Sequence, residues 1–131
     1  MKQIELMEKY PVFVLELSKD ACKYATTQEI VAYLKEKIAA HPVATFIALF
    51  DHYAHTSSLP EGTIAEGIIA AQDVIFCFGK ELPKPEVLGV RPRSIGIAEY
   101  EDKFIFSFLE APNPQATQTM QEWLTALRKE D

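Results

Sequence analysis

The length, composition and charge of the chain exclude several classes of protein. Its 131 residues are 48% hydrophobic and 24% charged, a globular composition that predicts a single domain over residues 1–131. The net charge of −6 argues against non-specific binding to nucleic acid, which depends on clustered Lys and Arg. No apolar run approaches the ~20 residues of a membrane span. Glu5 and Glu8 stand where a signal peptide needs apolar residues, so we expect a cytoplasmic protein without a membrane segment.

The first third of the chain predicts a short helical turn, a strand and a helix. Residues 3–9 can form a helical turn that Pro11 ends. Residues 12–17, VFVLEL, are β-branched and aromatic, which is typical of a strand. The segment 26–29, TTQE, fits a capping box, in which the Thr hydroxyl and the Glu carboxylate each satisfy a backbone donor. An apolar residue at every fourth position then indicates a helix that ends at His41-Pro42.

The middle of the chain alternates strands and loops. Residues 43–52 carry apolar side chains on both faces, which favours a central strand or a strand covered by a partner subunit. Residues 53–63 are rich in Ser, Pro and Gly and indicate a loop, whereas residues 64–72 fit either a short helix or an early strand. Residues 73–78 then predict a buried strand, and the prolines of residues 80–93 predict a long loop.

The last third predicts a hairpin and a helix. Residues 94–100 and 103–110 form two strands around a tight turn, with three Phe on one face of the second. Asn113 and Pro114 begin a helix with an apolar stripe at helical spacing. The predicted order is therefore strand, helix, four strands, helix. This order favours an α+β fold with a mainly antiparallel sheet and helices packed on one face.

Four segments carry a likeness to a known family: a helix, EIVAYLKEKIAAHP, that leads into a strand ending FDHYAHTSS, then DVIFCFGKELP, then RPRSIGIAEYEDKFIFSFLEAPNP. In these segments the chain, from Ile30 to its end, resembles the domain of unknown function 302 family. The segment Phe78-Gly79-Lys80-Glu81 departs from the family, whose turn carries Asn-Pro. The resemblance implies a TATA-binding-protein-like topology and no particular activity.

The strongest candidate site follows the strand of residues 43–52. Asp51, His52 and His55 offer a carboxylate and two imidazoles, which are ligands for divalent metals or contacts for a small molecule. The two histidines converge only if the chain turns at Tyr53-Ala54. A structural alternative is that Asp51 accepts a hydrogen bond from the loop backbone in an Asx turn.

Arg91 and Arg93 form a second candidate site. They flank Pro92 just before a strand, where two guanidinium groups can clamp an anionic ligand. The alternative is a solvated loop whose charges offset nearby Glu residues.

These features favour a small-ligand-binding or accessory module. The alternative is a metal-dependent or cofactor-dependent enzyme centred on Asp51, His52 and His55. If the helices cover only one face of the sheet, the N-terminal segment, a ligand or a second subunit must cover the other. We therefore expect a homodimer.

Overall fold

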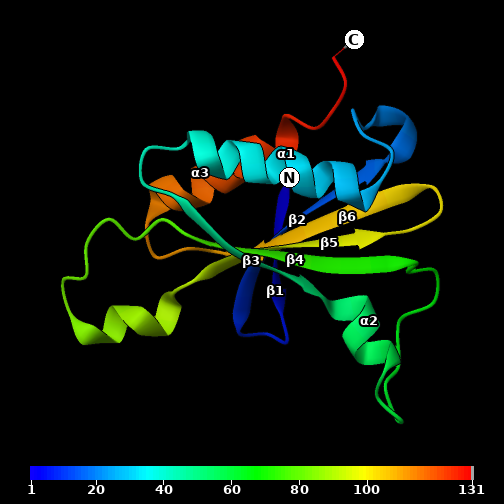
Figure 1. Ribbon diagram of the computed structural model, residues 1–131, viewed down its shortest axis with the longest axis horizontal. Helices are drawn as coiled ribbons and strands as arrows, with labels where there is room; N and C mark the ends of the chain where they lie inside the picture. Colours follow the sequence, from blue (N-terminus) through cyan, green and yellow to red (C-terminus); the bar gives the residue numbers. More distant parts are fainter. Residues whose placement is uncertain (131) are drawn as a thin grey trace.

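The fold is a six-stranded antiparallel sheet with its two long helices on one face, as the computed structural model of residues 1–130 shows (Figure 1). The elements in chain order are β1 (Lys2–Leu6), β2 (Tyr10–Ser18), the 3-10 helix η1 (Lys19–Ala21), α1 (Thr27–Ala40), β3 (Thr45–Asp51), α2 (His52–Ser57), β4 (Ala70–Cys77), the 3-10 helix η2 (Pro85–Val90), β5 (Arg93–Glu99), β6 (Lys103–Leu109) and α3 (Pro114–Thr125). The strands lie in the order β1-β2-β6-β5-β4-β3. The predicted α+β class is confirmed. Within residues 1–130, no helix combines the length and the apolar character needed to cross a membrane.

The core lies between the sheet and the helices α1 and α3. Alternate residues of the inner strands point at the helices and are buried there, so that the opposite side chains point away. We call these sides the helix face and the open face. The buried strand residues include Leu15, Leu17, Val74, Phe76, Ile95, Ile97, Phe104, Phe106 and Phe108. The aromatic face predicted for β6 and the apolar stripe predicted for the last helix are thus both confirmed.

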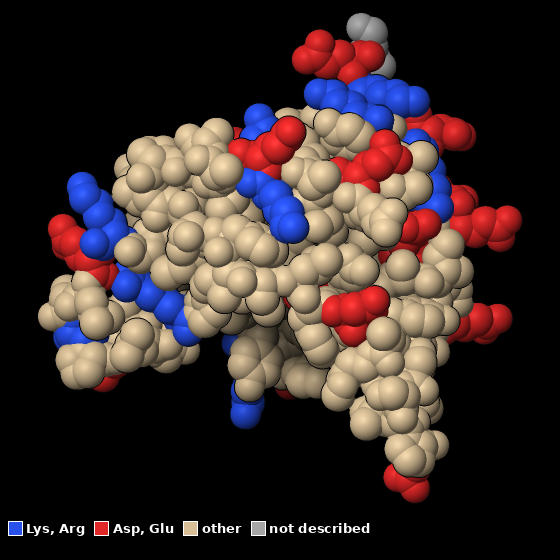
Figure 2. Space-filling model, viewed as in Figure 1, with Lys and Arg blue, Asp and Glu red and all other residues tan. Residues whose placement is uncertain are grey.

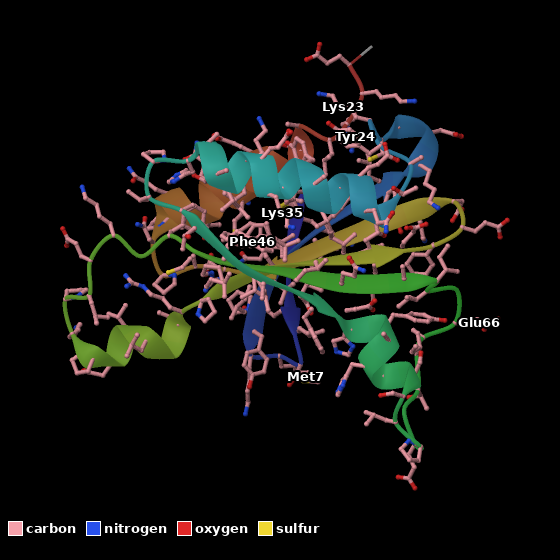
Figure 3. All side chains as sticks on the ribbon, in the orientation of Figure 1. Met7, Lys23, Tyr24, Lys35, Phe46 and Glu66 are labelled. Carbon is pink, nitrogen blue, oxygen red and sulfur yellow. The ribbon has the colours of Figure 1, made fainter. Side chains whose placement is uncertain are left out.

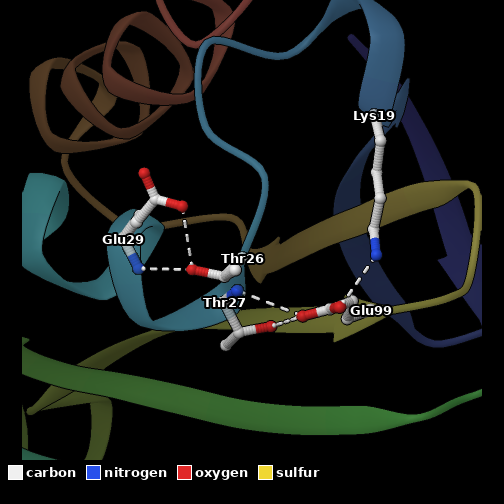
Figure 4. Close-up of polar contacts among 5 residues, drawn as sticks. All are labelled: Lys19, Thr26, Thr27, Glu29 and Glu99. Carbon is white, nitrogen blue, oxygen red and sulfur yellow. Dashed lines mark hydrogen bonds and ion pairs between the residues drawn. The ribbon is translucent and has the colours of Figure 1, made fainter.

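The first turn of α1 is held by two sets of hydrogen bonds (Figure 4). The Thr26 hydroxyl accepts from the backbone N–H of Glu29 at 3.2 Å, as predicted. The Glu29 carboxylate accepts from the Thr26 hydroxyl at 3.1 Å rather than from the backbone. Glu99, at the end of β5, accepts from the Thr27 N–H at 3.1 Å and the Thr27 hydroxyl at 2.5 Å, and pairs with Lys19 at 2.8 Å. This carboxylate joins the helix start to the sheet.

The predicted helical turn over residues 3–9 is wrong, because these residues form the edge strand β1 and a tight turn into β2. Lys2–Leu6 pairs antiparallel with the first half of β2. In the turn, Met7 and Glu8 have φ of 54° and 61°, and the Lys9 N–H donates to the Leu6 carbonyl at 3.2 Å. Two positive φ angles are typical of a type I′ hairpin turn, which usually contains Asn or Gly. Because neither Asn nor Gly is present here, the hairpin turn could not be recognised from the sequence.

The predictions for the middle of the chain need three corrections. Strand β3 lies at the edge of the sheet and not at its centre. Only part of it is covered by a helix: Phe46 lies under α1, with the Lys35 ammonium 4.7 Å from its ring centroid (Figure 3). The polar segment after β3 begins with the short helix α2 instead of a loop, and the 3-10 helix η2 interrupts the loop predicted over residues 80–93. Neither short helix has an apolar stripe long enough to be recognised in a sequence.

The Glu99 contacts predict an acid-sensitive component of stability. Burial raises the pKa of Glu99, but the hydrogen bonds from Lys19 and Thr27 outweigh it and hold that pKa below 4.5, its ordinary value. A depressed carboxyl pKa stabilises the fold above the unfolded-state value, and this contribution is lost as the pH falls. We expect Glu99→Gln to lower the free energy of unfolding at pH 7 by about 1–2 kcal/mol and to have little effect near pH 3, measured by urea denaturation. The matched control is Glu101→Gln, in the exposed turn two residues on. Equal losses at both pH values would contradict the role of the ionised carboxylate.

The hairpin turn predicts a stabilising double substitution. Asn and Gly tolerate positive φ, whereas Met and Glu do so at a cost of roughly 1 kcal/mol each. Met7→Asn with Glu8→Gly is therefore expected to raise the free energy of unfolding by about 1 kcal/mol, again measured in urea. Lys9→Gly serves as the control, because Lys9 is not among the positive-φ residues and Gly should destabilise it. A double variant no more stable than the native chain would contradict this account.

Candidate functional site

The short helix α2 positions Asp51, His52 and His55. Asp51 is its N-terminal cap, and the Asp51 carboxylate accepts from the Ala54 N–H at 2.9 Å. The Asx-type structural role predicted for Asp51 is thus present. His52 Nδ1 lies 2.9 Å from the Thr56 hydroxyl, one helical turn along. All three candidate residues are exposed.

The two imidazole rings of α2 do converge, together with the last aromatic residue of β3. The ring centroids of His52 and His55 are 6.2 Å apart, and Phe50 lies 5.3 Å and 5.6 Å from them. This is the spacing of residues at i and i+3 on a helix. Among the residues described, however, no three His, Cys, Asp or Glu side chains are placed to hold a metal ion. The geometry therefore gives no support to a metal site at Asp51, His52 and His55.

A carboxylate that the sequence analysis did not select lies on the open face beside α2. Asp73, in β4, is opposite Phe50 of β3 on one side and opposite Gly96 of β5 on the other. Gly96 is in turn opposite Ser107 of β6. These four residues form one row across the open face, in which Gly96 leaves a gap between two polar side chains. A Cβ on Gly96 would lie 3.3 Å from both Asp73 Oδ1 and Ser107 Oγ.

This gap is part of a cavity that we call the Asp73 cleft. Its volume is about 160 Å³, and its walls include His52, Asp73, Gly96 and Ser107, together with the apolar residues Ala71, Ala98 and Ile105. Burial raises the pKa of the Asp73 carboxyl above 3.8, and the nearby His52 opposes this only in part. A glycine inside a strand often marks a place where another group approaches closely, and this was the only signal of the cleft in the sequence.

The second candidate pair, Arg91 and Arg93, lies at the start of β5. Arg93 begins the strand and points to the helix face, like Ile95 after it, so its side chain is buried with 9% of its area exposed. Arg91 is half-buried, and its Nη1 donates to the Glu81 carbonyl at 2.7 Å. The alternative of a fully solvated arginine loop is therefore wrong for Arg93.

The guanidinium of Arg93 is only partly satisfied by the protein. It donates to the carbonyls of Leu109 and Val90, the latter at 3.5 Å, while its buried Nε has no hydrogen-bond partner among the described residues. The ion pairs found in residues 1–130 are Lys19–Glu99 and Lys103–Glu16, so neither candidate arginine has a carboxylate partner there. Burial accordingly lowers the pKa of Arg93, although an arginine stays protonated in proteins.

Both arginines line a cavity of about 170 Å³ that we call the arginine pocket. Its other walls come from the end of β4, from η2 and from the start of α3, and they are mostly apolar: Phe78, Gly79, Val87, Val90, Ala111, Pro112, Asn113 and Ala116. The positive end of the α3 dipole adds to the potential here. Its first N–H groups are already occupied, since Asn113 Oδ1 accepts from Gln115 and the Asn113 carbonyl accepts from Ala116 and Thr117. The guanidinium groups are therefore the principal donors of the pocket.

The structure does not combine the two candidate sites. Arg91 and Arg93 share the arginine pocket, whereas His52 lines the Asp73 cleft, and no residue is common to the walls of both. In Figure 1, α2 and η2 project from opposite ends of the sheet. One small ligand cannot contact both groups at once.

The comparison with known proteins identifies a family and no activity. The model of the Family of unknown function (DUF6858) matches residues 1–129, which replaces the resemblance to the domain of unknown function 302 family. The TATA-binding-protein-like topology is not confirmed. No curated protein and no solved structure matches the sequence. With nearly its whole length covered by that family model, the chain belongs to the Family of unknown function (DUF6858).

Proposed function

We propose that this protein binds a small carboxylate with an apolar body in the arginine pocket. The observation that carries the proposal is Arg93, a cation buried to 9% exposure with an unpaired Nε and no carboxylate beside it among residues 1–130. A buried charge without a partner is costly, so its partner is expected from outside the chain. Perturbed charged groups in a pocket are typical of binding sites.

The shape and chemistry of the arginine pocket define the ligand class. Guanidinium groups pair with carboxylates through two parallel hydrogen bonds, which makes arginine the usual partner of this anion. The apolar walls favour a ligand with a hydrocarbon part over a small inorganic anion. One water molecule takes about 30 Å³ in the liquid. If each non-hydrogen atom of a ligand needs about this volume, the 170 Å³ pocket holds roughly six of them. Butyrate has this size and chemistry and is the probe of choice.

Butyrate titration of the isotopically labelled protein tests the proposal. We expect saturable shifts of the Gly79 and Ala111 amide signals, and at least about tenfold weaker binding in Arg93→Met, because a charge-assisted hydrogen bond is lost. Arg93→Met should melt at the same or a higher temperature, since an apolar side chain replaces an unpaired buried charge. Arg128→Met, at an exposed position outside the pocket, is the matched control.

Two results would contradict carboxylate binding. One is the lack of saturable shifts in the native protein at millimolar butyrate. The other is an Arg93→Met variant that folds and binds butyrate as tightly as the native chain does.

We also propose that two copies of the chain associate through the open face. The N-terminal segment extends the sheet as β1 and therefore does not cover this face. By the strand register, one end of the open face carries an apolar patch on β1, β2 and β6, consisting of Ile4, Leu6, Tyr10, Val12 and Leu109. Four of these are exposed, at 38–50% of their area. An exposed apolar patch of this kind is typical of an interface.

The position of the apolar patch suits a second copy. The patch lies on β1, β2 and β6, at one end of the open face. The β1–β2 turn around Met7 projects beyond the sheet beside it, whereas the lobe formed by α2 stands at the other end of the face, next to the Asp73 cleft (Figures 2 and 3). A second copy seated on the patch and this turn leaves the cleft open. The patch contains no charged side chain, so two copies can cover it without burying an unpaired charge.

Sedimentation equilibrium tests the dimer. We expect a mass of twice 14.8 kDa for the native protein and 14.8 kDa for Leu109→Lys, which places a charge inside the patch. Leu82→Lys, at a leucine that is 60% exposed and lies outside the patch, should stay dimeric. A native protein that remains at 14.8 kDa at millimolar concentration would refute the dimer.

A further inference from the structure

The Asp73 cleft is a second ligand site, and we propose that it binds a small primary ammonium compound. The cleft lies on the open face at the end nearest α2, in the two cross-strand rows that contain Ala71–Ala98–Ile105 and Asp73–Gly96–Ser107. The apolar patch around Leu109 lies farther along β6, beyond Ser107. This site is separate from the arginine pocket and does not depend on carboxylate binding there.

The Asp73 carboxylate is half-buried in the cleft and takes part in neither of the ion pairs found in residues 1–130. Burial raises its pKa, and the charge of His52 opposes this only in part. Carboxylates in such surroundings are normally paired or hydrogen-bonded. His52 supplies charge nearby, but its Nδ1 already lies 2.9 Å from the Thr56 hydroxyl.

Ser107, a second polar residue of the cleft, is placed to share a ligand with Asp73. Ser107 Oγ and Asp73 Oδ1 lie on either side of Gly96, each 3.3 Å from the point where a Cβ on this residue would stand. An ammonium group above that point, beyond contact distance from the Gly96 Cα, can donate to both oxygens, because it carries three N–H donors. The missing side chain of Gly96 provides the space for it.

The walls of the cleft select a short apolar chain behind the ammonium. Ala71 and Ala98 are small, and Ile105 closes the side away from β4, so these walls are apolar, while His52 and Gln72 add two polar groups to the lining. Its volume of about 160 Å³ corresponds to roughly five non-hydrogen atoms. A short alkylammonium ion has this size, this charge and this apolar body. Butylammonium is therefore the probe, with the same hydrocarbon part as butyrate and the opposite charge.

Titration with the two probes of opposite charge tests the proposal. Labelled native protein is titrated separately with butylammonium chloride and sodium butyrate at pH 7, and the amide signals of Gly96 and Ser107 are followed. We expect butylammonium to shift both signals saturably, and Asp73→Asn to bind it at least about tenfold more weakly, because the hydrogen bond to a charged group is lost. Butyrate affinity should be unchanged in Asp73→Asn. Asp51→Asn, at an exposed carboxylate that caps α2, is the matched charge control and should bind butylammonium normally.

A second variant tests the space above Gly96 without changing any charge. Gly96→Ala places a methyl group 3.3 Å from Asp73 Oδ1 and Ser107 Oγ, between the two oxygens and beneath the position proposed for the ammonium. We expect it to abolish butylammonium binding while leaving butyrate binding intact. Gly89→Ala, whose added Cβ meets no atom within 4 Å, is the control and should bind both probes.

The proposal is overturned by any of three results. These are a native protein whose Gly96 and Ser107 signals do not saturate with butylammonium, a folded Asp73→Asn variant with native affinity, and a folded Gly96→Ala variant with native affinity. These outcomes do not depend on whether Arg93→Met loses butyrate binding, so the proposals for the two sites are tested independently.

Discussion

The packing of both long helices on the same face of the sheet is the constraint on which the rest of the structure depends. Alternate side chains of the inner strands are buried beneath α1 and α3. A slip of one residue would move the whole apolar set of a strand into water, so this burial fixes the register. The intervening side chains must then form rows across the open face. Asp73, Gly96 and Ser107 share a row for this reason, although they lie far apart in the sequence.

Arg93 and Asp73 are charged groups that burial disfavours, and both line cavities. Arg93 occupies a helix-face position that Ile95 and Ile97 continue as core, and Asp73 stands on the open face of β4. Burial lowers the pKa of the first and raises that of the second, which means that each charged form is disfavoured where it stands. Replacing a buried charge that lacks a charged partner with an apolar residue of similar size is often neutral or stabilising. Residues that weaken a fold locally without a compensating contact are those expected to serve a function.

The sequence predicted the elements that have strong local patterns, and it failed where the decisive contacts join distant segments. The helices α1 and α3 and five of the strands have a regular apolar period or a cap, and each was found. Strand β1 was missed because its turn uses Met7 and Glu8 at positive φ in place of Asn or Gly. Strand β3 was placed at the centre because it is apolar on both faces. In the structure Ile47 and Leu49 are exposed at 51% and 41% instead, so two apolar faces did not mean two covered faces.

The candidate sites show the same limit. Asp51, His52 and His55 were recognised because they are adjacent in the chain, and the structure uses Asp51 to cap α2. The guanidinium pair of Arg91 and Arg93 was recognised from its own dipeptide spacing. Asp73 and Ser107 offered no local motif, because their proximity comes from the pairing of β4, β5 and β6. Only Gly96, a glycine in the middle of a strand, marked the place.

Arg93 and Asp73 do not neutralise each other, because their side chains lie on opposite faces of the sheet. They lie on the adjacent strands β5 and β4 and have opposite charges, yet Arg93 points to the helix face and Asp73 to the open face. Where this chain forms a structural ion pair on the sheet, both members project from one face: Lys103 and Glu16 meet at 2.9 Å across neighbouring strands. An Arg and an Asp placed to stabilise the fold would follow that pattern. Their separation by the sheet leaves each charge facing its own cavity, and the two cavities then suit ligands of opposite charge.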